Sequence, residues 1–478
     1  MTDHLTDRDG PRDECGVFGI YAPDHDVARL AYFALYALQH RGQESAGIAT
    51  TDLGGNIMTL RDLGLVSQVF DEQRLRALPG DMALGHVRYS TTGSSAWENA
   101  QPVYRSDARE LALAHNGNLT NAVELHAELR EADVAFRSTS DSEIIAALLS
   151  THAAERIEDA VADVLPRLKG AFSTVVMTRE KIVAFRDPHG LRPLALGMVG
   201  DRYCVASESC ALDIIGARFL REVEPGEVVT IDGGGISTRI AIEGARRAFC
   251  VFEYIYFARP DSIMGGTVLQ GARGRMGEIL AREAPVEADL VIAVPDSGNP
   301  AARGFARASG IPQDDGFVKN RYVARTFIQP GQELRKHGLR LKFNPMPEIV
   351  AGKRLVVVDD SIVRGNTTRQ IVEMLRDAGA REVHLRITAP PIRHPCHYGI
   401  DMSTREEMIA HGREVPAIAA ELGADSLHYL SLAGVYEAVG STRETHCDAC
   451  FTGEYPLPDG PGGQDKHAFE QALPVIHA

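Results

Sequence analysis

The chain has 478 residues, more than a usual single domain, and 44% of them are hydrophobic, which is enough for a core in each of two domains. Its formal net charge of -15 at pH 7 argues against nucleic acid or an anionic membrane surface as its general partner. No apolar run is long enough to span a bilayer and the N-terminus is not signal-like, so we expect a cytoplasmic protein.

The first fourteen residues, Met1 to Glu14, are polar, lack an apolar period and are predicted to be disordered. Cys15 follows directly and opens an alternating apolar strand. This start resembles that of the mature N-terminal nucleophile (Ntn) glutamine amidotransferases. In that chemistry the α-amine of the cysteine accepts its proton, so the resemblance implies that residues 1–14 are a propeptide cut at the Glu14–Cys15 bond. The alternative is a buried structural cysteine behind a floppy tail.

Further segments of the N-terminal half resemble the same family in the same order; they are 39–47, 85–91, 115–118 and 138–143. The resemblance implies that Arg88 and Asp141 bind the two ends of glutamine. It also implies that the Asn116 side chain and the Gly117 N–H donate to the oxyanion formed when Cys15 attacks the amide. The structural alternatives are a surface salt bridge for Arg88, a hairpin turn at 116–117 and a helix N-cap at Asp141.

The N-terminal half is rich in predicted strands, and the family resemblance implies an αββα amidotransferase domain over residues 15–235. Glycine-rich turns at 224–227 and 233–235 mark its predicted end. Residues 236–478 would form the second domain. There short apolar strands alternate with helical segments, which predicts a mainly parallel sheet with crossover helices. The predicted fold class is therefore two-domain, α+β followed by α/β.

The strand predicted at Leu290–Val294 is followed by the loop 295–300. A loop at the carboxyl end of a parallel strand is a plausible diphosphate site, and a structural βα turn is the alternative. Residues 319–342 then form a long connection with several basic side chains. Such a connection is usually a lid or disordered, and a lid would keep water away from the reaction, whereas the alternative is a solvated basic loop.

The stretch 354–370 has the strongest pattern in the chain. Leu355–Val358 is an apolar, β-branched run, predicted to be a strand buried on both faces. Asp359 and Asp360 follow it, and adjacent carboxylates suit sugar hydroxyls or a bound Mg²⁺. The alternative is a solvated acidic turn.

A polar loop and a helix are predicted next. The helix is expected from Arg369 to Asp377, with Thr367 or Thr368 as its cap, so that its N-terminus forms a phosphate cradle. The whole pattern resembles the phosphoribosyl-diphosphate (PRPP) motif of type I phosphoribosyltransferases. The resemblance implies that PRPP is bound by Asp359, Asp360, Ser361, Arg364, Gly365, Thr367 and Thr368. One Mg²⁺ per subunit would be held by Ser297, Asp359 and Asp360.

The seven cysteines are more consistent with catalysis or metal binding than with disulfides, because we expect a reducing compartment. Cys447 and Cys450 form a Cys-x-x-Cys pair, and Cys250 and Cys396 lie far from it in sequence. The residues alone fit a redox pair, half of a zinc site or half of an iron–sulfur site. These four positions resemble the ligands in the branch of the amidophosphoribosyltransferase family that carries a [4Fe-4S] cluster and a propeptide. The resemblance implies a structural, oxygen-sensitive cluster.

Both motif sets occur in family order, and the chain is identified by resemblance as a member of this family. The resemblance implies the first committed step of purine synthesis, in which glutamine-derived ammonia displaces diphosphate from PRPP to give 5-phosphoribosylamine. It also implies a homo-oligomer, a tetramer, inhibited by purine nucleotides at Lys319, Arg321, Ser297 and Ser361. One alternative is a PRPP-sensing regulatory protein, against which stand the intact amidotransferase half and the lack of a basic nucleic-acid-binding segment. Another is an amidotransferase with a different acceptor, such as a sugar phosphate.

Overall fold

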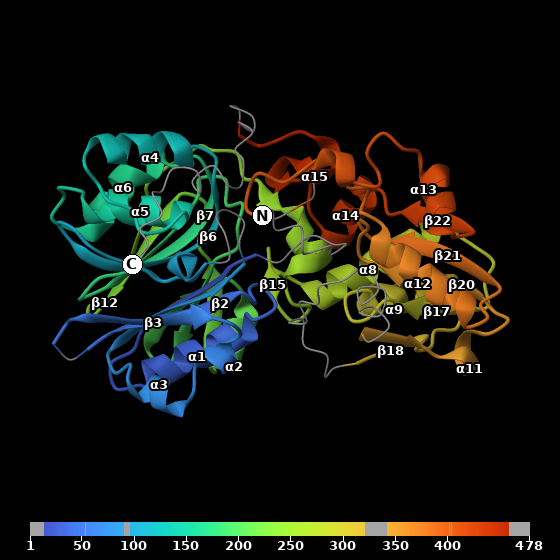
Figure 1. The fold of residues 1–478 in the computed structure, drawn as a ribbon, viewed down its shortest axis with the longest axis horizontal. Coiled ribbons are helices and arrows are strands. Elements are labelled where there is room, and N and C mark those ends of the chain that lie inside the picture. Colours follow the sequence, from blue (N-terminus) through green and yellow to red (C-terminus); the bar gives the residue numbers. More distant parts are fainter. Residues whose placement is uncertain are drawn as a thin grey trace.

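The computed structural model describes residues 14–52, 54–89, 96–320, 342–400, 402 and 404–457. The chain forms two lobes, one containing β1 to β13 and the other containing β15 to β22 (Figure 1). Among the described residues, no helix has the length and apolar character needed to cross a membrane.

The first lobe is built on two antiparallel sheets. The seven-stranded sheet has the order β11-β9-β10-β1-β4-β2-β3, and the six-stranded sheet has the order β13-β12-β8-β7-β6-β5. The bounds of the first are β1 (Gly16–Tyr21), β2 (Ser45–Thr51), β3 (Ile57–Leu63), β4 (Met82–Arg88), β9 (Ala195–Val199), β10 (Arg202–Ala206) and β11 (Arg218–Glu222). Those of the second are β5 (Val103–Ser106), β6 (Glu110–Leu119), β7 (Gly170–Met177), β8 (Ile182–Arg186), β12 (Glu227–Asp232) and β13 (Gly235–Ile240).

The two sheets pack against each other, and helices cover their outer faces. Side chains alternate along β1, so Val17 joins the core between the sheets while Phe18 and Ile20 join the core under the helices. The helices of the first sheet are α1 (Val27–Ala37), α2 (Val66–Val69), α3 (Glu72–Arg76) and α7 (Ser209–Ile214). Those of the second are α4 (Ala122–Glu131), α5 (Asp141–Ser150) and α6 (Ile157–Val164), and short 3₁₀ turns lie at Trp97–Asn99 and Leu165–Arg167. The predicted αββα layering is confirmed.

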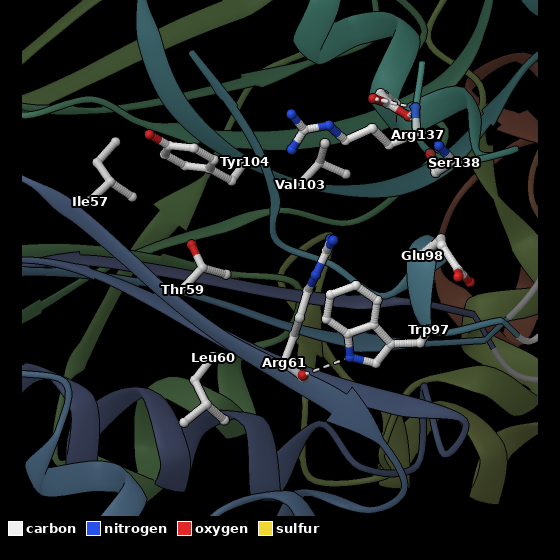
Figure 2. A pocket seen from close by; sticks show the side chains of 11 residues that line it. Ile57, Thr59, Leu60, Arg61, Trp97, Glu98, Val103, Tyr104, Arg137 and Ser138 are labelled. Carbon is white, nitrogen blue, oxygen red and sulfur yellow. Dashed lines mark hydrogen bonds between the residues drawn. The ribbon is translucent and has the colours of Figure 1, made fainter. Parts of the chain in front are cut away.

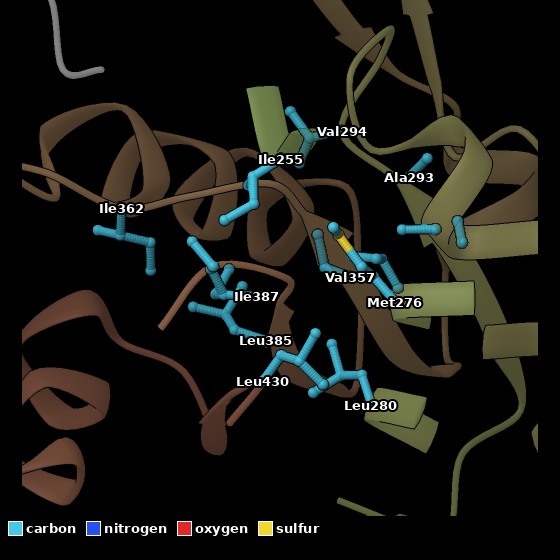
Figure 3. Close-up of a cluster of buried hydrophobic side chains, with 14 of the residues drawn as sticks. Ile255, Met276, Leu280, Ala293, Val294, Val357, Ile362, Leu385, Ile387 and Leu430 are labelled. Atoms are coloured by element: carbon cyan, nitrogen blue, oxygen red, sulfur yellow. The ribbon is translucent and has the colours of Figure 1, made fainter. Parts of the chain in front are cut away.

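The second lobe is organised around a parallel sheet with the order β17-β20-β21-β22. Its strands are β17 (Leu290–Ala293), β20 (Arg354–Asp359), β21 (Glu382–Ile387) and β22 (Ser426–Tyr429). Figure 3 shows Val357 and Leu385 of the sheet in one apolar cluster with Met276 and Leu280. The predicted strands in this lobe and its parallel sheet are confirmed.

The helices of the second lobe are α8 (Leu269–Glu283), α9 (Asn299–Ser309), α11 (Pro347–Val350), α12 (Asn366–Asp377), α13 (Val415–Leu422), α14 (Leu432–Val439) and α15 (Ala449–Thr452). A π-helical turn lies at Glu253–Phe257, and 3₁₀ turns lie at Arg405–Glu407 and Arg443–Thr445. The short strands are β14 (Phe249–Cys250), β15 (Ile263–Met264), β16 (Thr267–Val268), β18 (Phe317–Lys319), β19 (Phe343–Pro345) and β23 (His446–Cys447).

The chain path after β17 creates a binding position in the sheet. From β17 the chain passes through α9 to a short segment that bridges β17 at Val291 and Gln313, and it then crosses to β20 on the other side of β17. Ligands of open α/β sheets bind where the strand order reverses in this way, beyond the carboxyl ends of the strands. The loops after β17 and β20 therefore lie at this edge.

The first lobe extends past the predicted boundary at residue 235. Gly235 is the first residue of β13, which pairs with β12 from Gly235 to Ile240. The last strand of the six-stranded sheet thus lies beyond the glycine-rich turn that marked the predicted domain end.

Candidate functional site

Cys15 lies immediately before β1, at the carboxyl end of its neighbour β4. Its side chain is buried, and its Sγ–H donates to the carbonyl of Tyr89 at 3.4 Å. Burial raises the pKa of the Cys15 thiol to about 11. The thiol is therefore neutral near pH 7, and it needs a base to become a nucleophile.

Arg88 and Asp141 lie close enough to Cys15 for their charges to act on its thiol. Arg88 ends β4, its side chain is only 3% exposed, and its Nη1 is 3.7 Å from Glu44 Oε2. The alternative of a surface salt bridge at Arg88 is therefore wrong. Glu44, for which the sequence predicts no role, lies in the matched segment 39–47, and its charge also acts on the Cys15 thiol.

Asp141 is the first residue of α5, and its position is fixed from two sides. Its Oδ2 accepts the Leu119 N–H at 2.9 Å, and its Oδ1 is 3.8 Å from His115 Nδ1. The N-cap of the helix is Ser140, so the alternative of a capping role for Asp141 is wrong. A buried carboxylate near a buried guanidinium and a thiol suits a ligand that carries both an ammonium and a carboxylate.

Asn116 and Gly117 lie within β6, paired with β7, so the hairpin-turn alternative is wrong. Asn116 is buried, and among the described residues its Nδ2 has no hydrogen-bond partner. Gly117 has a φ of 144°, and a Cβ there would lie 2.0 Å from the Ala171 carbonyl oxygen. A buried amide donor without a partner costs free energy unless a ligand uses it, which fits an oxyanion donor.

Glu14 is buried, which contradicts the prediction that disorder extends to this residue. Its Oε2 lies 3.1 Å from Arg41 Nη1, and its Oε1 pairs with Arg192. Arg41 also pairs with Glu253 of the second lobe at 2.6 Å and with Glu208. Arg41 lies in the matched segment 39–47, but the sequence does not predict these contacts between distant residues. The other thirteen residues of the predicted propeptide lie outside the described part of the chain.

Two aligned short strands bring Cys250 opposite Cys447, and both cysteines and Cys396 interact electrostatically with Cys450. Burial raises the pKa of each of these four thiols. The Tyr398 N–H donates to Cys396 Sγ at 3.4 Å. Among the described residues, no three His, Cys, Asp or Glu side chains are placed to hold a single metal ion. The four cysteines therefore gather at one place without converging on one ion.

Cys204 and Cys210 are buried in the core of the first lobe, where they pack among apolar side chains.

Asp359 and Asp360 lie at the carboxyl end of β20, as predicted. The Asp360 N–H donates to Asp359 Oδ1 at 2.9 Å, and Ser361 Oγ donates to Asp360 Oδ1 at 2.6 Å. Ser297, from the loop after β17, also hydrogen-bonds to Asp360. Burial raises the pKa of both carboxyls, and for Asp359 the neighbouring Asp360 charge adds to the effect. A cation bound here would lower both pKa values again.

The helix that follows begins earlier than predicted. α12 starts at Asn366, and its N-cap is Gly365 with a φ of 84°. The predicted start at Arg369 and the predicted caps Thr367 and Thr368 are therefore wrong, and both threonines lie in the first turn. The Arg369 N–H makes the first helical bond, to the Gly365 carbonyl at 2.9 Å, so the amides before it face the loop.

Arg364, in the same loop, lies 3.0 Å from Glu407 through its Nη2. Lys319 lies in β18 and pairs with Asp296 of the loop after β17, so a basic side chain does reach this edge of the sheet. Arg321 and most of the predicted lid, residues 321–341, lie outside the described residues.

A pocket of about 430 Å³ lies between the edge strands β3 and β5 of the first lobe. Figure 2 shows Arg61, Trp97 and Arg137 around it, with the Trp97 Nε1–H donating to the Arg61 carbonyl at 3.2 Å. None of the predicted site residues lines this pocket, and we assign it no role in the reaction.

Comparison with known proteins places both halves of the chain. Residues 86–213 match a glutamine amidotransferase domain, and residues 266–398 match a phosphoribosyl transferase domain. The chain is 53% identical to the amidophosphoribosyltransferase of Mycobacterium tuberculosis strain H37Rv, over 94% of this chain and 88% of that protein. It is 47% identical to that of Bacillus subtilis strain 168, over 95% of this chain and 96% of that protein.

Solved structures agree with these sequence matches. The glutamine PRPP amidotransferase from B. subtilis complexed with ADP and GMP superposes with a TM-score of 0.88 at 46% identity, covering 93% of this chain and 99% of that one. A second structure, described as the allosteric regulatory enzyme of purine biosynthesis, has a TM-score of 0.90 at 46% identity, covering 95% of this chain and 99% of that one.

Proposed function

This chain belongs to the amidophosphoribosyltransferase family, and we propose that its two sites divide the family's reaction between them. The enzyme catalyses the first step of purine biosynthesis: glutamine, PRPP and water give 5-phosphoribosylamine, glutamate and diphosphate. One observation carries the assignment of residues. A buried thiol beside Arg88 and Asp141 and a partly buried acid pair before a helix N-terminus occur in one chain.

Cys15 is the nucleophile of the glutamine half. After cleavage of the Glu14–Cys15 bond its α-amine takes the thiol proton, and the thiolate attacks the side-chain amide carbon of glutamine. The Asn116 amide and the Gly117 N–H donate to the oxyanion, which then collapses to a thioester as ammonia leaves with the proton. Water hydrolyses the thioester to glutamate. Arg88 and Asp141 hold the two ends of the amino acid, which leaves its side chain at the thiol.

The transfer half joins ammonia to the ribose. The ammonia nitrogen attacks the anomeric carbon of PRPP while the bond to diphosphate breaks, so the configuration inverts. Asp359 and Asp360 accept hydrogen bonds from the ribose hydroxyls, and the first turn of α12 binds the 5′-phosphate together with Arg364. Ser297 and the two aspartates would hold Mg²⁺, which neutralises diphosphate charge when bound. Two carboxylates and a hydroxyl fit this ion, since Mg²⁺ is usually bound by one or two carboxylates with substrate phosphates.

Cys250, Cys396, Cys447 and Cys450 are proposed to hold a [4Fe-4S] cluster. Among the described residues, the four cysteines gather at one place but are not placed to hold a single metal ion. A cubane cluster is bound at its corners, so its cysteine ligands lie farther apart than those of a zinc ion. The arrangement therefore supports a cluster over zinc. When bound, it ties the start and end of the second lobe together. Anaerobically purified protein should contain iron and acid-labile sulfide that Cys396→Ser removes and Cys204→Ser retains; zinc in their place would refute the cluster.

Purine nucleotides are proposed as inhibitors that bind at the proposed PRPP site, beyond the carboxyl ends of β17 and β20. The B. subtilis structure named above is a complex with ADP and GMP, and Lys319, Ser297 and Ser361 of this chain lie in or beside the loops at the end of the sheet. Arg321 is the fourth residue proposed to bind the nucleotide. A nucleotide titration that leaves activity unchanged would refute the proposed inhibition. The propeptide, the tetramer and the cytoplasmic location likewise remain predictions from the sequence.

The coupled reaction is tested by anaerobic assay of the matured protein with Mg²⁺ and PRPP, with and without glutamine. We expect diphosphate release to require glutamine and to match the glutamate formed. A Cys15→Ala variant should lose glutamine-dependent synthesis and keep ammonia-dependent synthesis. Glutamate without diphosphate would leave an amidotransferase with another acceptor. If neither glutamate nor diphosphate forms, the PRPP-sensing alternative is favoured. The assembled Cys15 site argues against that alternative.

A further inference from the structure

A segment of the second lobe lies directly against the oxyanion strand of the first lobe. The segment is Cys396–Gly399, and the strand is β6. Asn118 Nδ2 donates to the His397 carbonyl at 3.0 Å. A Cβ built on Gly399 would lie 3.0 Å from both the Cα and the carbonyl carbon of Gly117, so the two backbones are in close contact.

The first lobe holds this segment firmly in place. Arg192 Nε donates to the Tyr398 carbonyl at 2.8 Å, and the Arg192 side chain is 1% exposed. The Tyr398 ring is buried in a small apolar cluster with Ala171, Leu191 and Ala248. Ala171 lies in β7 and is the partner of Asn118 in β6. The Tyr398 ring therefore packs beside β7, the strand paired with β6, which carries the proposed oxyanion donors.

Gly117 is therefore confined by two neighbours. The Ala171 carbonyl leaves no room for a Cβ at Gly117, and the backbone of Gly399 lies in contact with it. Gly117 also has a φ of 144°, a conformation that few other residues would adopt. A peptide in this conformation keeps its orientation only if its surroundings fix it, and an oxyanion donor acts only when it points at the developing charge.

We propose that Cys396–Gly399 is a positioning element through which the second lobe fixes the Gly117 peptide and so sets the rate of glutamine cleavage. The inference rests on the proposed oxyanion role of Asn116 and Gly117. The segment contains none of the residues proposed to bind glutamine or PRPP. It acts through Gly117 and Asn118, and it links the cysteine-rich side of the transferase lobe to the glutamine site by backbone contact.

The test is a Gly399→Ala variant of the full-length, matured enzyme. Gly399 has a φ of 106°, so alanine is strained there and its methyl group pushes on Gly117. Gly352→Ala is the matched control, because Gly352 has a φ of 72° with nothing within 4 Å of its Cβ position. It also places an alanine at a positive φ in the same lobe, and its methyl group does not reach β6.

We expect Gly399→Ala to lower the kcat of glutamine hydrolysis by about tenfold to a hundredfold, since one misplaced oxyanion donor costs up to about a thousandfold. The KM for glutamine should change by less than about twofold, because Arg88 and Asp141 remain in place. Ammonia-dependent synthesis should be unchanged. Gly352→Ala should match the wild type in all three measurements. Asn118→Ala, which removes the bond to His397 without strain, should lower the same kcat to a smaller extent.

A kcat equal to that of the wild type in both Gly399→Ala and Asn118→Ala overturns the proposal. Equal losses of glutamine-dependent and ammonia-dependent activity also overturn it, because they indicate a general structural defect. If Gly399→Ala fails to mature, Asn118→Ala decides alone. An Asn116→Ala variant tests the premise of this inference. Full glutamine-dependent activity in that variant refutes the oxyanion assignment and this inference with it. The assay of coupled products in the wild type tests the overall function independently.

Discussion

The carboxylate of Glu14 lies 3.1 Å from the guanidinium of Arg41, and both side chains are almost completely buried. Glu14 directly precedes Cys15, the proposed nucleophile, so this contact holds the peptide bond at which the proposed maturation would cut. Burial raises the pKa of Glu14, and the charge of Arg192 opposes that rise. The last residue of the proposed propeptide is thus part of the folded lobe.

Replacing Glu14 should slow propeptide removal. Glu14→Gln leaves Arg41 and Arg192 with one carboxylate fewer, which weakens the contacts that hold the Glu14 side chain in place. We expect a larger fraction of uncut chain at each time after synthesis, measured by intact mass. Glu287→Gln is the control, since that side chain is 95% exposed. Identical maturation of the wild type and Glu14→Gln would show that Glu14 does not hold the scissile bond.

The reactivity of Cys15 should change with maturation. In the chain that still carries Glu14, burial holds the pKa of Cys15 at about 11, so the thiolate is scarce at pH 7. Alkylation of Cys15 by iodoacetamide should be slow there and rise about tenfold per pH unit toward that pKa. The mature chain would carry a free α-amine, whose usual pKa is about 7.7–8.0, and Cys15 should react much faster there at pH 8.

Cys204 serves as an internal control for this alkylation. It is buried, its thiol pKa is raised to about 12, and peptide mapping should find it unmodified in both forms. A Cys15 rate in the uncut chain that does not depend on pH would contradict the expectation.

The Asp359–Asp360 pair should make stability depend on Mg²⁺. The folded-state pKa of both carboxyls is raised above the unfolded value, so their contribution to stability is present below the unfolded pKa and is lost as pH rises through the folded pKa. At neutral pH without metal the pair therefore destabilises the fold. Mg²⁺ at about 100 times its Kd should stabilise it by about 2.7 kcal/mol, and Tm should rise.

The Asp359→Asn variant checks this assignment. It should have a higher Tm than the wild type without metal and should respond little to Mg²⁺, while PRPP-dependent activity falls. Titration with Na⁺ at matched ionic strength controls for screening. A Tm increase with Mg²⁺ of the same size in Asp359→Asn would place the ion elsewhere.

Gly365→Ala should weaken PRPP binding. Gly365 has a φ of 84°, and a Cβ there would lie 2.4 Å from Ile409 Cδ1. An alanine in this conformation costs about 1–2 kcal/mol, so the KM for PRPP should rise about tenfold while glutamine hydrolysis is retained. Gly440→Ala, with a φ of 76° and an open Cβ position, should leave the KM unchanged. Equal KM values in the two variants would argue against a tight loop at Gly365.

The sequence predicts the parallel strands of the second lobe well because Leu355–Val358 is apolar and β-branched throughout, and such a run has few other stable arrangements. It predicts the start of α12 poorly. Threonine is a common cap, but here Gly365 takes the N-cap position in a left-handed conformation that depends on the surrounding chain. Local preference alone does not reveal that choice.

The sequence likewise predicts some residues of the candidate site and not others. Cys15, Arg88 and Asp141 stand in recognisable segments, and the structure brings them together. The burial of Glu14 depends on Arg41 and Arg192, and the contact between Gly117 and Gly399 joins residues from different lobes. Contacts between residues so far apart in sequence leave no local pattern.

The parallel pairing of β14 with β23 places Cys250, near the start of the second lobe, opposite Cys447, near the end of the described chain. The ribosome synthesises the chain from the N-terminus, so β14 is made first. Its partner β23 is made only after almost the whole second lobe has been synthesised. Truncated translation products that end before Cys447 lack β23 and two of the four cysteines, so they cannot form this strand pair.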